Sequence, residues 1–256
     1  MRIIPSQWNE KILWLKVNDY NHNPQVKQCA DKLEVRKYIE KTGCGEILNE
    51  IIKVYDTAED IKLEELPKSF VMKLNIGCGC NYVCYNKDEV NLHELKEKFK
   101  KWMRKKYYLT YAELQYKDVK PYIIVEKYLG NEKKCLPLDY KFYCFNGVCK
   151  NVMLCTERKL GSTAKFFYFD RNWNMLPYTS DAINESNISI QKPPAIDMAF
   201  SYAERLSKGF PFVRVDLYIV QNKIYFGELT FTPSAGLDVS RLPQTDLLLG
   251  NELQLS

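Results

Sequence analysis

Apolar and polar residues follow the period of β-strands in several parts of the chain. The clearest case is RVDLYIVQNKIYFGELTFTPSAG over 214–236, in which two β-forming runs flank a polar Gln-Asn-Lys and predict a hairpin. A second hairpin is predicted over 138–158, because Asn146-Gly147 is a strong turn signal. Further strands are predicted over 47–56, 69–75, 82–85 and 121–130, and a strand pair over 164–178.

The helical period predicts the remaining elements. Residues 90–108 form the strongest helical stretch, and 197–210 has apolar positions at helical spacing before Gly209. Helices are also predicted over 31–43 with Asp31 as N-cap, over 58–67 and in the tail at 242–255, whereas 179–195 has the composition of a loop. The order of elements indicates an α+β chain with mixed and antiparallel sheets and no internal repeat.

Composition narrows the class of protein. The chain has 256 residues, 46% of them hydrophobic, which fits one large domain or two small lobes. The net charge of +5 favours anionic ligands but is too small to indicate nucleic acid. Nine cysteines without a secretory signal indicate a reducing cytosol, and no apolar run is long enough to span a membrane. Two histidines argue against zinc and against catalysis by a Ser-His or Cys-His pair.

The 214–236 hairpin carries charged residues on one face. A turn centred on Asn222 places Asp216 opposite Glu228, where two like charges destabilise the pair unless a cation lies between them. Mg²⁺ suits such a site, because it binds one or two carboxylates together with substrate phosphates. The same register pairs Val220 with Ile224 and Arg214 with Thr230. The alternative is a solvated face on which Arg214 neutralises both acids.

Two stretches have features of a nucleotide site. KLNIGCGCNYV (73–83) places Lys73 at a strand end before Gly77 and Gly79, which let backbone amides approach an anion, although a plain β-turn explains the same residues. The stretch is neither a Walker loop nor a Rossmann fingerprint. VEKYL (125–129) ends a strand that could present its backbone, and the Glu126 carboxylate, to an adenine edge, or could be an ordinary strand end.

Residues 96–106 hold seven Lys or Arg against one Glu. A solvated helix face is the favoured interpretation. The alternative is a docking surface for an acidic polymer or a membrane.

The order of these pieces resembles the ATP-grasp superfamily: an Asp-Lys pair opening a helix, a lysine strand with a glycine loop, a VEKYL-like hinge, then R-x-D and E-x-T around a short hairpin. DYKFYCFNG and FVRVDLY…KIYFGELTF are similar, more narrowly, to TupA-like ATP-grasp proteins of polysaccharide biosynthesis loci. The resemblance covers roughly 27–250. It implies two lobes that clamp the nucleotide, with a truncated N-terminal lobe. The implied parts are an N-terminal segment with the Asp-Lys element (1–66), a small lobe (67–137) and a large lobe (138–256).

The resemblance also implies roles for individual residues, with ATP and Mg²⁺ as cofactors. The implied phosphate-binding residues are Lys32, Lys73, Gly77, Gly79 and Lys141; those of the adenine and ribose sites are Glu126, Lys127, Tyr128, Leu129 and Asp139; the metal ligands are Asp216, Glu228 and Thr230. Arg214 and Lys73 would be catalytic. Thr230 stands where the superfamily usually has Asn, and Ile76 and Cys78 stand where His and Ser are expected.

The activity that the resemblance implies is an ATP-dependent carboxylate–amine ligase working through an acyl phosphate. It would form an amide on a uronic acid or sugar acid during surface (capsular) polysaccharide assembly in the cytoplasm. The carboxylate would belong to a small molecule or to a polysaccharide-linked unit, and an amine would be the second substrate. No nucleic acid partner is expected, and peripheral contact with a membrane is possible. The alternatives are a phosphotransferase on the same fold, a glycosyltransferase, which the absence of a DxD pattern disfavours, and a non-catalytic nucleotide-binding module.

Overall fold

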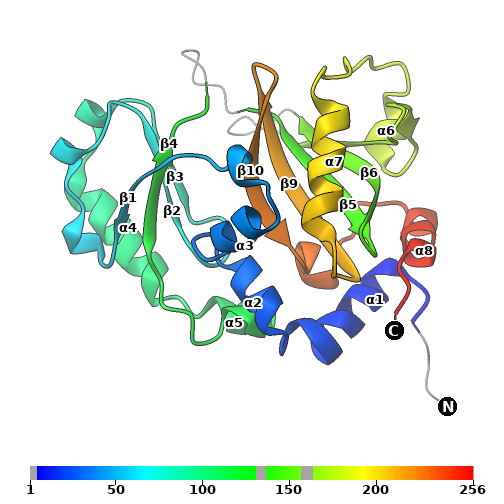
Figure 1. The fold of residues 1–256 in the computed structure, drawn as a ribbon, viewed down its shortest axis with the longest axis horizontal. Helices are drawn as coiled ribbons and strands as arrows, with labels where there is room; N and C mark the ends of the chain where they lie inside the picture. The colour runs from blue at the N-terminus through cyan, green and yellow to red at the C-terminus, as the bar shows by residue number, and fades with distance from the viewer. Residues whose placement is uncertain (1–4, 131–136, 157–163, 256) are drawn as a thin grey trace. The chain divides into compact units, whose positions relative to one another are not determined.

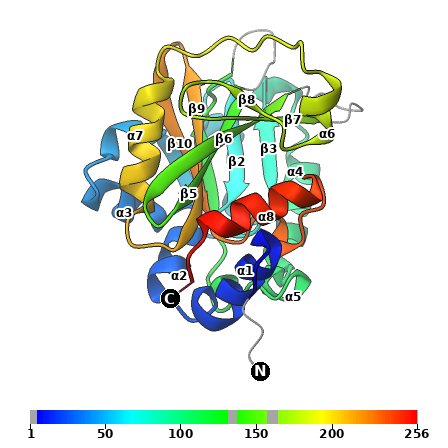
Figure 2. The ribbon, with the colours of Figure 1, turned by 90° about the vertical axis from the view of Figure 1, so that its right-hand side faces the viewer.

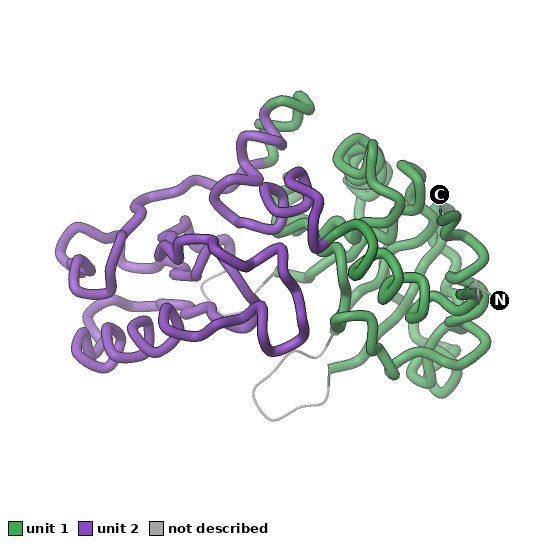
Figure 3. The backbone as a smooth tube through the Cα atoms, turned by 90° about the horizontal axis from the view of Figure 1, so that it is seen from below, with its two compact units in different colours: residues 1–20, 41–47, 137–256 green, residues 21–40, 48–136 purple. Residues whose placement is uncertain are grey.

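The computed structural model describes residues 5–130, 137–156 and 164–255. The chain divides into two compact units built from interleaved segments (Figure 3). Unit 1 consists of residues 1–20, 41–47 and 137–256, and unit 2 of residues 21–40 and 48–136. The three parts expected from the sequence, 1–66, 67–137 and 138–256, stay predictions; the last segment of unit 1 begins at residue 137.

Unit 1 contains a six-stranded sheet with strand order β10-β9-β5-β6-β7-β8, antiparallel throughout (Figure 1). Helix α7 covers one face of this sheet, where the ring of Phe200 meets Phe142 edge-on. Helix α1 covers the other face through Trp8, whose ring contacts Tyr143 and Phe212. Helix α8 runs beside α1 (Figure 2), and a Cβ on Gly250 would come 2.2 Å from the Ser6 carbonyl oxygen.

The strands of unit 1 are β5 (Asp139–Phe145), β6 (Val148–Thr156), β7 (Lys165–Phe169), β8 (Met175–Leu176), β9 (Phe212–Val220) and β10 (Lys223–Thr230). Its helices are α1 (Trp8–Leu15), α6 (Ser180–Asn184), α7 (Ile196–Ser207) and α8 (Pro243–Glu252), with shorter helical turns η1 (Lys16–Tyr20), η2 (Gly45–Ile47) and η7 (Pro233–Gly236). The last two residues of the hairpin expected over 138–158 lie outside the described residues.

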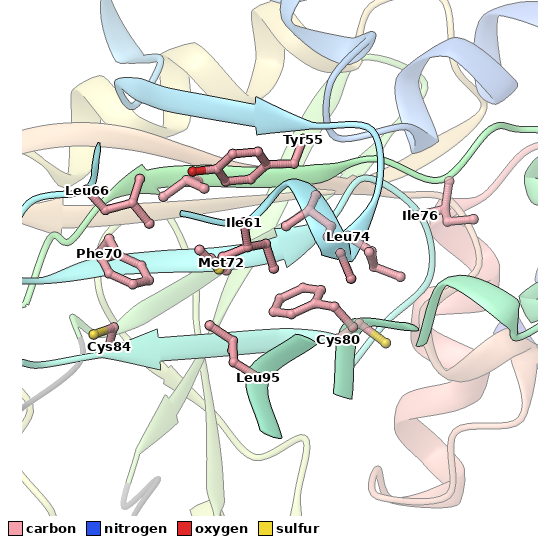
Figure 4. Packing of buried hydrophobic residues seen from close by; sticks show 14 of the residues in the cluster. Tyr55, Ile61, Leu66, Phe70, Met72, Leu74, Ile76, Cys80, Cys84 and Leu95 are labelled. Atoms are coloured by element: carbon pink, nitrogen blue, oxygen red, sulfur yellow. The ribbon is translucent and has the colours of Figure 1, made fainter. Parts of the chain in front are cut away.

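Unit 2 contains a four-stranded sheet with order β1-β4-β2-β3, also antiparallel throughout. Its core lies between this sheet and the elements around it, and includes Phe70, Met72 and Leu74 of β2 (Figure 4). Helix α4 packs against the core through Leu95 and Phe99. The strands are β1 (Ile51–Tyr55), β2 (Phe70–Leu74), β3 (Asn81–Cys84) and β4 (Ile123–Lys127). The helices are α2 (Pro24–Ala30), α3 (Val35–Lys41, which ends in unit 1), α4 (Leu92–Arg104) and α5 (Tyr107–Thr110), with η3 (Ala58–Asp60), η4 (Leu63–Glu65), η5 (Lys87–Glu89) and η6 (Leu114–Tyr116).

Several expected elements differ from the structure. Helix α1 and helix α2 were not expected, although Asn23 caps α2 by accepting from the Gln25 amide at 3.0 Å and Pro24 occupies its first position. The helix expected over 31–43 begins only at Val35. The helix expected over 58–67 consists instead of η3 and η4, and the loop expected over 179–195 contains α6. The α+β class is confirmed, and no described helix has the length and apolar character needed to cross a membrane.

The two hairpins of unit 1 turn in the same way. Asn146 and Gly147 both have positive φ, as the sequence predicts. In the second hairpin the turn is Gln221-Asn222, with φ of 50° and 63°, so Val220 pairs with Lys223 and the expected Val220–Ile224 pair is wrong. A bulge between Phe226 and Glu228 then adds one residue to β10.

Candidate functional site

The bulge restores the register that the sequence predicts further along the hairpin. Glu228 pairs with Asp216 and Thr230 pairs with Arg214, as expected. On the other side of β9, Lys141 of β5 pairs with Asp216. Paired residues point to the same face of a sheet, so Lys141, Asp216 and Glu228 form a row of charged side chains across three strands. The next row consists of Tyr143, Arg214 and Thr230.

Asp216 is the centre of this group, and its side chain is only 4% exposed. Its two carboxylate oxygens accept from Nε and Nη2 of Arg214, each at 2.7 Å. Lys141 Nζ donates to Asp216 at 2.7 Å and to Asp139 at 2.5 Å. Two cations and two carboxylates are therefore joined in one largely buried network, whose geometry includes a bidentate Arg–carboxylate pair.

The pKa values of this network reflect burial and charge together. Burial raises the pKa of the Asp216 carboxyl, while Arg214 and Lys141 act to lower it. Burial acts to lower the pKa of Lys141, but Asp216 and Asp139 outweigh this effect and the pKa is raised. The pKa of Arg214 is raised for the same reason, against the effect of its burial. Both basic side chains therefore keep their charge, and they favour the ionised form of Asp216, because protonation would leave two buried cations without a counter-charge.

Glu228 and Thr230 lie at the more exposed edge of the group. The Thr230 hydroxyl donates to Glu228 Oε1 at 3.0 Å and accepts from Arg214 Nη2 at 3.1 Å. The guanidinium of Arg214 also lies 3.6 Å from Glu228 Oε1. Arg214 thus contacts each of the three residues that the sequence predicts as metal ligands.

The donors of this group fit a hard divalent cation. Within the described residues, no three acidic, Cys or His side chains come together as a ready-made metal site. Asp216, Glu228 and Thr230 offer oxygen atoms only, and two carboxylates suffice for Mg²⁺ when phosphate oxygens complete its coordination. Asp216 would then exchange part of its contacts with Arg214 and Lys141 for the metal.

In unit 2, Lys73 is bonded to Glu126. Lys73 Nζ lies 2.9 Å from Glu126 Oε1, and both side chains are mostly buried, at 14% and 12% exposure. The two residues lie on adjacent strands, where Lys73 pairs with Ile124 and Val71 pairs with Glu126, so both point to one face. The carboxylate that the sequence assigns to the adenine site is therefore held by the lysine that it assigns to the phosphates.

The glycine loop follows β2 and requires both glycines. Gly77 and Gly79 have φ of 73° and 72°, in the left-handed region that other residues adopt at a cost. A Cβ on Gly77 would also come 2.5 Å from the Tyr107 ring. Lys32 Nζ donates to the Gly77 carbonyl oxygen at 2.7 Å. The structure thus brings Lys32 to the glycine loop, as the predicted phosphate site requires.

Asn75, which the sequence analysis did not single out, connects these elements. Its side chain is fully buried, donates to Asp31 at 2.8 Å and to the Lys120 carbonyl at 3.1 Å, and accepts from the Tyr122 amide at 2.7 Å. The Asn75 carbonyl accepts from the Lys32 amide at 2.8 Å. Asn75 therefore fixes the Asp-Lys pair at the base of the glycine loop. The one signal in the sequence is a polar residue at the end of a buried strand.

The hinge predicted at 126–129 is anchored at Lys127. The Lys127 amide donates to the Glu50 carbonyl at 3.0 Å, and the Asn49 side chain donates to the Lys127 carbonyl at 2.9 Å. Tyr128 meets Tyr85 edge-on. Both the amide and the carbonyl of Lys127, the last residue of β4, are therefore bonded within unit 2.

Solved structures with a similar fold include two ligases and a synthetase. A D-alanine–D-alanine ligase from Bacillus anthracis in complex with ATP has a TM-score of 0.52 and 16% identity, with coverage of 88% of this chain and 61% of its own. The VanG D-Ala:D-Ser ligase from Enterococcus faecalis has a TM-score of 0.54 and 14% identity, with coverage of 88% and 61%. An N5-carboxyaminoimidazole ribonucleotide synthetase in complex with ADP has a TM-score of 0.51 and 12% identity, with coverage of 87% and 50%. This likeness establishes an ATP-grasp fold, and the chain spans about three fifths of the first two structures and half of the third.

The family follows from the sequence. The model of the TupA-like ATP-grasp family matches residues 10–254, so the chain belongs to this family. No curated protein matches the chain.

Proposed function

We propose that the protein is an ATP-dependent ligase that joins a carboxylate to an amine. The observation that carries this proposal is the row of Lys141, Asp216 and Glu228 with Arg214 beside it, which gathers cations and metal-binding oxygens on one face of the unit 1 sheet. The family and the ATP-grasp fold support it, because the solved structures of this fold described above are ligases or synthetases.

The proposed reaction has two steps. The substrate carboxylate oxygen attacks the γ-phosphorus of ATP, and the bond to the β,γ-bridging oxygen breaks, which gives an acyl phosphate and ADP. The amine then attacks the acyl carbon, phosphate leaves with the electrons of the C–O bond, and the amine proton passes to solvent. Neither step requires a protein nucleophile, in agreement with two histidines in the chain. Phosphoryl transfer depends on positioning and charge neutralisation.

The residues of the chain supply that positioning and charge. Arg214 and Lys141 place positive charge beside Asp216, where negative charge develops on the transferred phosphoryl group. Mg²⁺ held by Asp216 and Glu228, with Thr230 as a weaker ligand, would neutralise the phosphates further.

The residues of unit 2 would hold the nucleotide. Lys32, Lys73 and the loop of Gly77 and Gly79 would bind the phosphates of ATP. The adenine would lie against the hinge residues Glu126, Lys127, Tyr128 and Leu129. The ribose role of Asp139 rests on the family resemblance alone.

The substrate class is a finer proposal. The resemblance to proteins of polysaccharide loci supports an amide on a uronic acid or sugar acid, formed during surface polysaccharide assembly in the cytoplasm.

The test measures ADP release from ATP and Mg²⁺ with a panel of uronic acids and amines. A ligase releases ADP at full rate only when a carboxylate and an amine are both present, and hydroxylamine in place of the amine traps the acyl phosphate as a hydroxamate. ADP release with a phosphorylated hydroxyl and without an amine would establish a phosphotransferase instead. Absence of any ADP release across the panel, together with no effect of ATP and Mg²⁺ on the melting temperature, would contradict nucleotide-dependent catalysis.

A further inference from the structure

The basic helix α4 changes character along its length. Its first three lysines, Lys96, Lys98 and Lys100, contact other residues of unit 2. Lys96 donates to the Glu59 carbonyl at 2.8 Å, and Lys100 forms ion pairs with Glu59 and Glu97. Lys98 lies over the rings of Tyr82 and Trp102 at 5.5 and 5.6 Å. These lysines are explained by the fold of the unit itself.

The basic residues in the last turn of α4 and directly after it form no such ion pairs within the described residues. Lys101, Arg104, Lys105 and Lys106 are all exposed, and none of them forms an ion pair with another residue of the described chain. Cations in a final turn stabilise the helix by interaction with its dipole, but that effect is worth only about 0.3–1 kcal/mol each and ends with the helix. It does not account for Lys105 and Lys106, which follow the last helical residue. Lys105 also lies over the Tyr107 ring at 5.1 Å, but its side chain stays exposed.

Exposed apolar residues lie directly beside these cations. Helix α5 begins at Tyr107, and the Leu109 amide donates to the Lys106 carbonyl at 3.1 Å, so Leu109 lies within one turn of the basic residues. The Leu109 side chain is 65% exposed and Tyr111 is 51% exposed. The buried Tyr107 fixes α5 in place, because its hydroxyl donates to the Trp102 carbonyl at 3.2 Å. The surface therefore combines four basic residues with a large aliphatic and an aromatic side chain.

We propose that this surface, formed by Lys101, Arg104, Lys105, Lys106, Leu109 and Tyr111, docks on an anionic phospholipid bilayer. Each Lys or Arg near such a bilayer gains free energy from its negative surface potential, and Leu109 leaves water when it enters the headgroup region. A soluble polyanion such as an acidic glycan or RNA would bind the cations but leave Leu109 in water. The apolar residues thus favour the bilayer. The inference does not depend on the proposed ligase activity.

The test is sedimentation of the full chain with vesicles of equal parts phosphatidylglycerol and phosphatidylcholine, compared with vesicles of phosphatidylcholine alone. Binding to the anionic vesicles that weakens as salt rises is expected, because salt screens exposed charges. The double variant Lys101→Gln/Arg104→Gln should lower the partition coefficient roughly fivefold per charge, about 30-fold in all. Leu109→Ser should lower it by about tenfold.

A matched control removes the same charge elsewhere in unit 2. Lys27 and Lys68 are exposed, so Lys27→Gln/Lys68→Gln should bind the vesicles nearly as well as the wild type. Thermal melts establish that all variants are folded. The proposal is wrong if the anionic vesicles are not preferred, or if the two double variants bind equally. It is also wrong if Leu109→Ser binds the vesicles like the wild type while Lys101→Gln/Arg104→Gln loses binding to soluble polyglutamate, which would assign the surface to a polyanion.

Discussion

Glu228 lies directly opposite Asp216 because β10 carries one residue more than β9 between the turn and this pair. Without a bulge, the two-residue Gln221-Asn222 turn would pair Asp216 with Gly227 instead of Glu228. Glu228 would then point to the opposite face of the sheet from Asp216. The bulge at Gly227 cancels this one-residue offset. The central pair of the site therefore depends on two irregularities that compensate each other.

Gly227→Ala should disturb this arrangement. A Cβ at position 227 would lie 2.9 Å from the Asp216 carbonyl oxygen and 3.2 Å from the Tyr218 ring, so β10 has to move away from β9. We expect the free energy of unfolding to fall by about 1–3 kcal/mol, as for other overpacked sites. We also expect ADP release to need more Mg²⁺. Urea unfolding and a Mg²⁺ titration of turnover measure the two effects. An unchanged Mg²⁺ dependence would show that the bulge is not needed to position the proposed metal ligands.

Arg214→Ala should reduce turnover by about 100-fold, because a preorganised donor to a developing negative charge is typically worth about 3 kcal/mol. Arg214→Lys should recover little, since a single ammonium cannot reproduce the bidentate contact with Asp216. Steady-state turnover, with ATP affinity measured separately, distinguishes loss of catalysis from loss of binding. Turnover of Arg214→Ala near the wild-type value would remove Arg214 from the proposed mechanism.

Glu126→Gln should make the protein more dependent on nucleotide. In the wild type the mostly buried Lys73 has Glu126 as a counter-charge, and loss of a hydrogen bond between charged groups costs about 1.5–3 kcal/mol. If Lys73 binds phosphate, ATP supplies the missing negative charge. The melting temperature should thus be lower than that of the wild type without ATP, and ATP should raise it by more than in the wild type. An equal increase in both proteins would argue against phosphate binding by Lys73.

Tyr202→Phe should make the free energy of unfolding fall less steeply as the pH rises above about 10. The Tyr202 hydroxyl donates to Glu46 at 2.7 Å, and this bond, followed by burial, raises its pKa to about 12. A raised pKa means that the folded state holds the proton more tightly. The stabilising effect is complete below the unfolded pKa of about 10 and is lost as pH rises towards 12. Unfolding measured by urea from pH 8 to 11.5 should show a shallower decline for Tyr202→Phe, and parallel curves would contradict the role of this bond.

Much of the geometry of the site is predictable from the alternation of side chains along strands and from the residues that favour turns. The period of two places Arg214, Asp216, Glu228 and Thr230 on one face, and the structure agrees. The Asn146-Gly147 turn was predictable because both residues tolerate positive φ. Family resemblance identified the remaining phosphate and adenine residues, whose roles stay predictions.

Other features could not be predicted because they depend on contacts between distant residues. The Gly227 bulge depends on how β9 and β10 pair. Asn75 is important because Asp31 and Tyr122 meet it in space. Arg241 is a further example: its side chain is 1% exposed, bonded to Asp238 at 2.7 Å, and lies over the Trp8 ring at 4.1 Å, which no local pattern signals. Helix α1 was missed for a different reason, because Trp8, Ile12 and Leu15 do have helical spacing but the charged residues between them concealed it.

The interleaved segments have a consequence for folding during translation. Residues 21–40 and 48–136 emerge early, so unit 2 has all of its chain before most of unit 1 has been translated. Tyr20, which bonds to the Phe212 backbone, and Glu46, which bonds to Tyr202, must wait for partners made more than 150 residues later. Helix α1 is thus synthesised well before Phe212, which the Trp8 ring contacts, and a nascent chain that stalls before residue 212 leaves this ring without that partner.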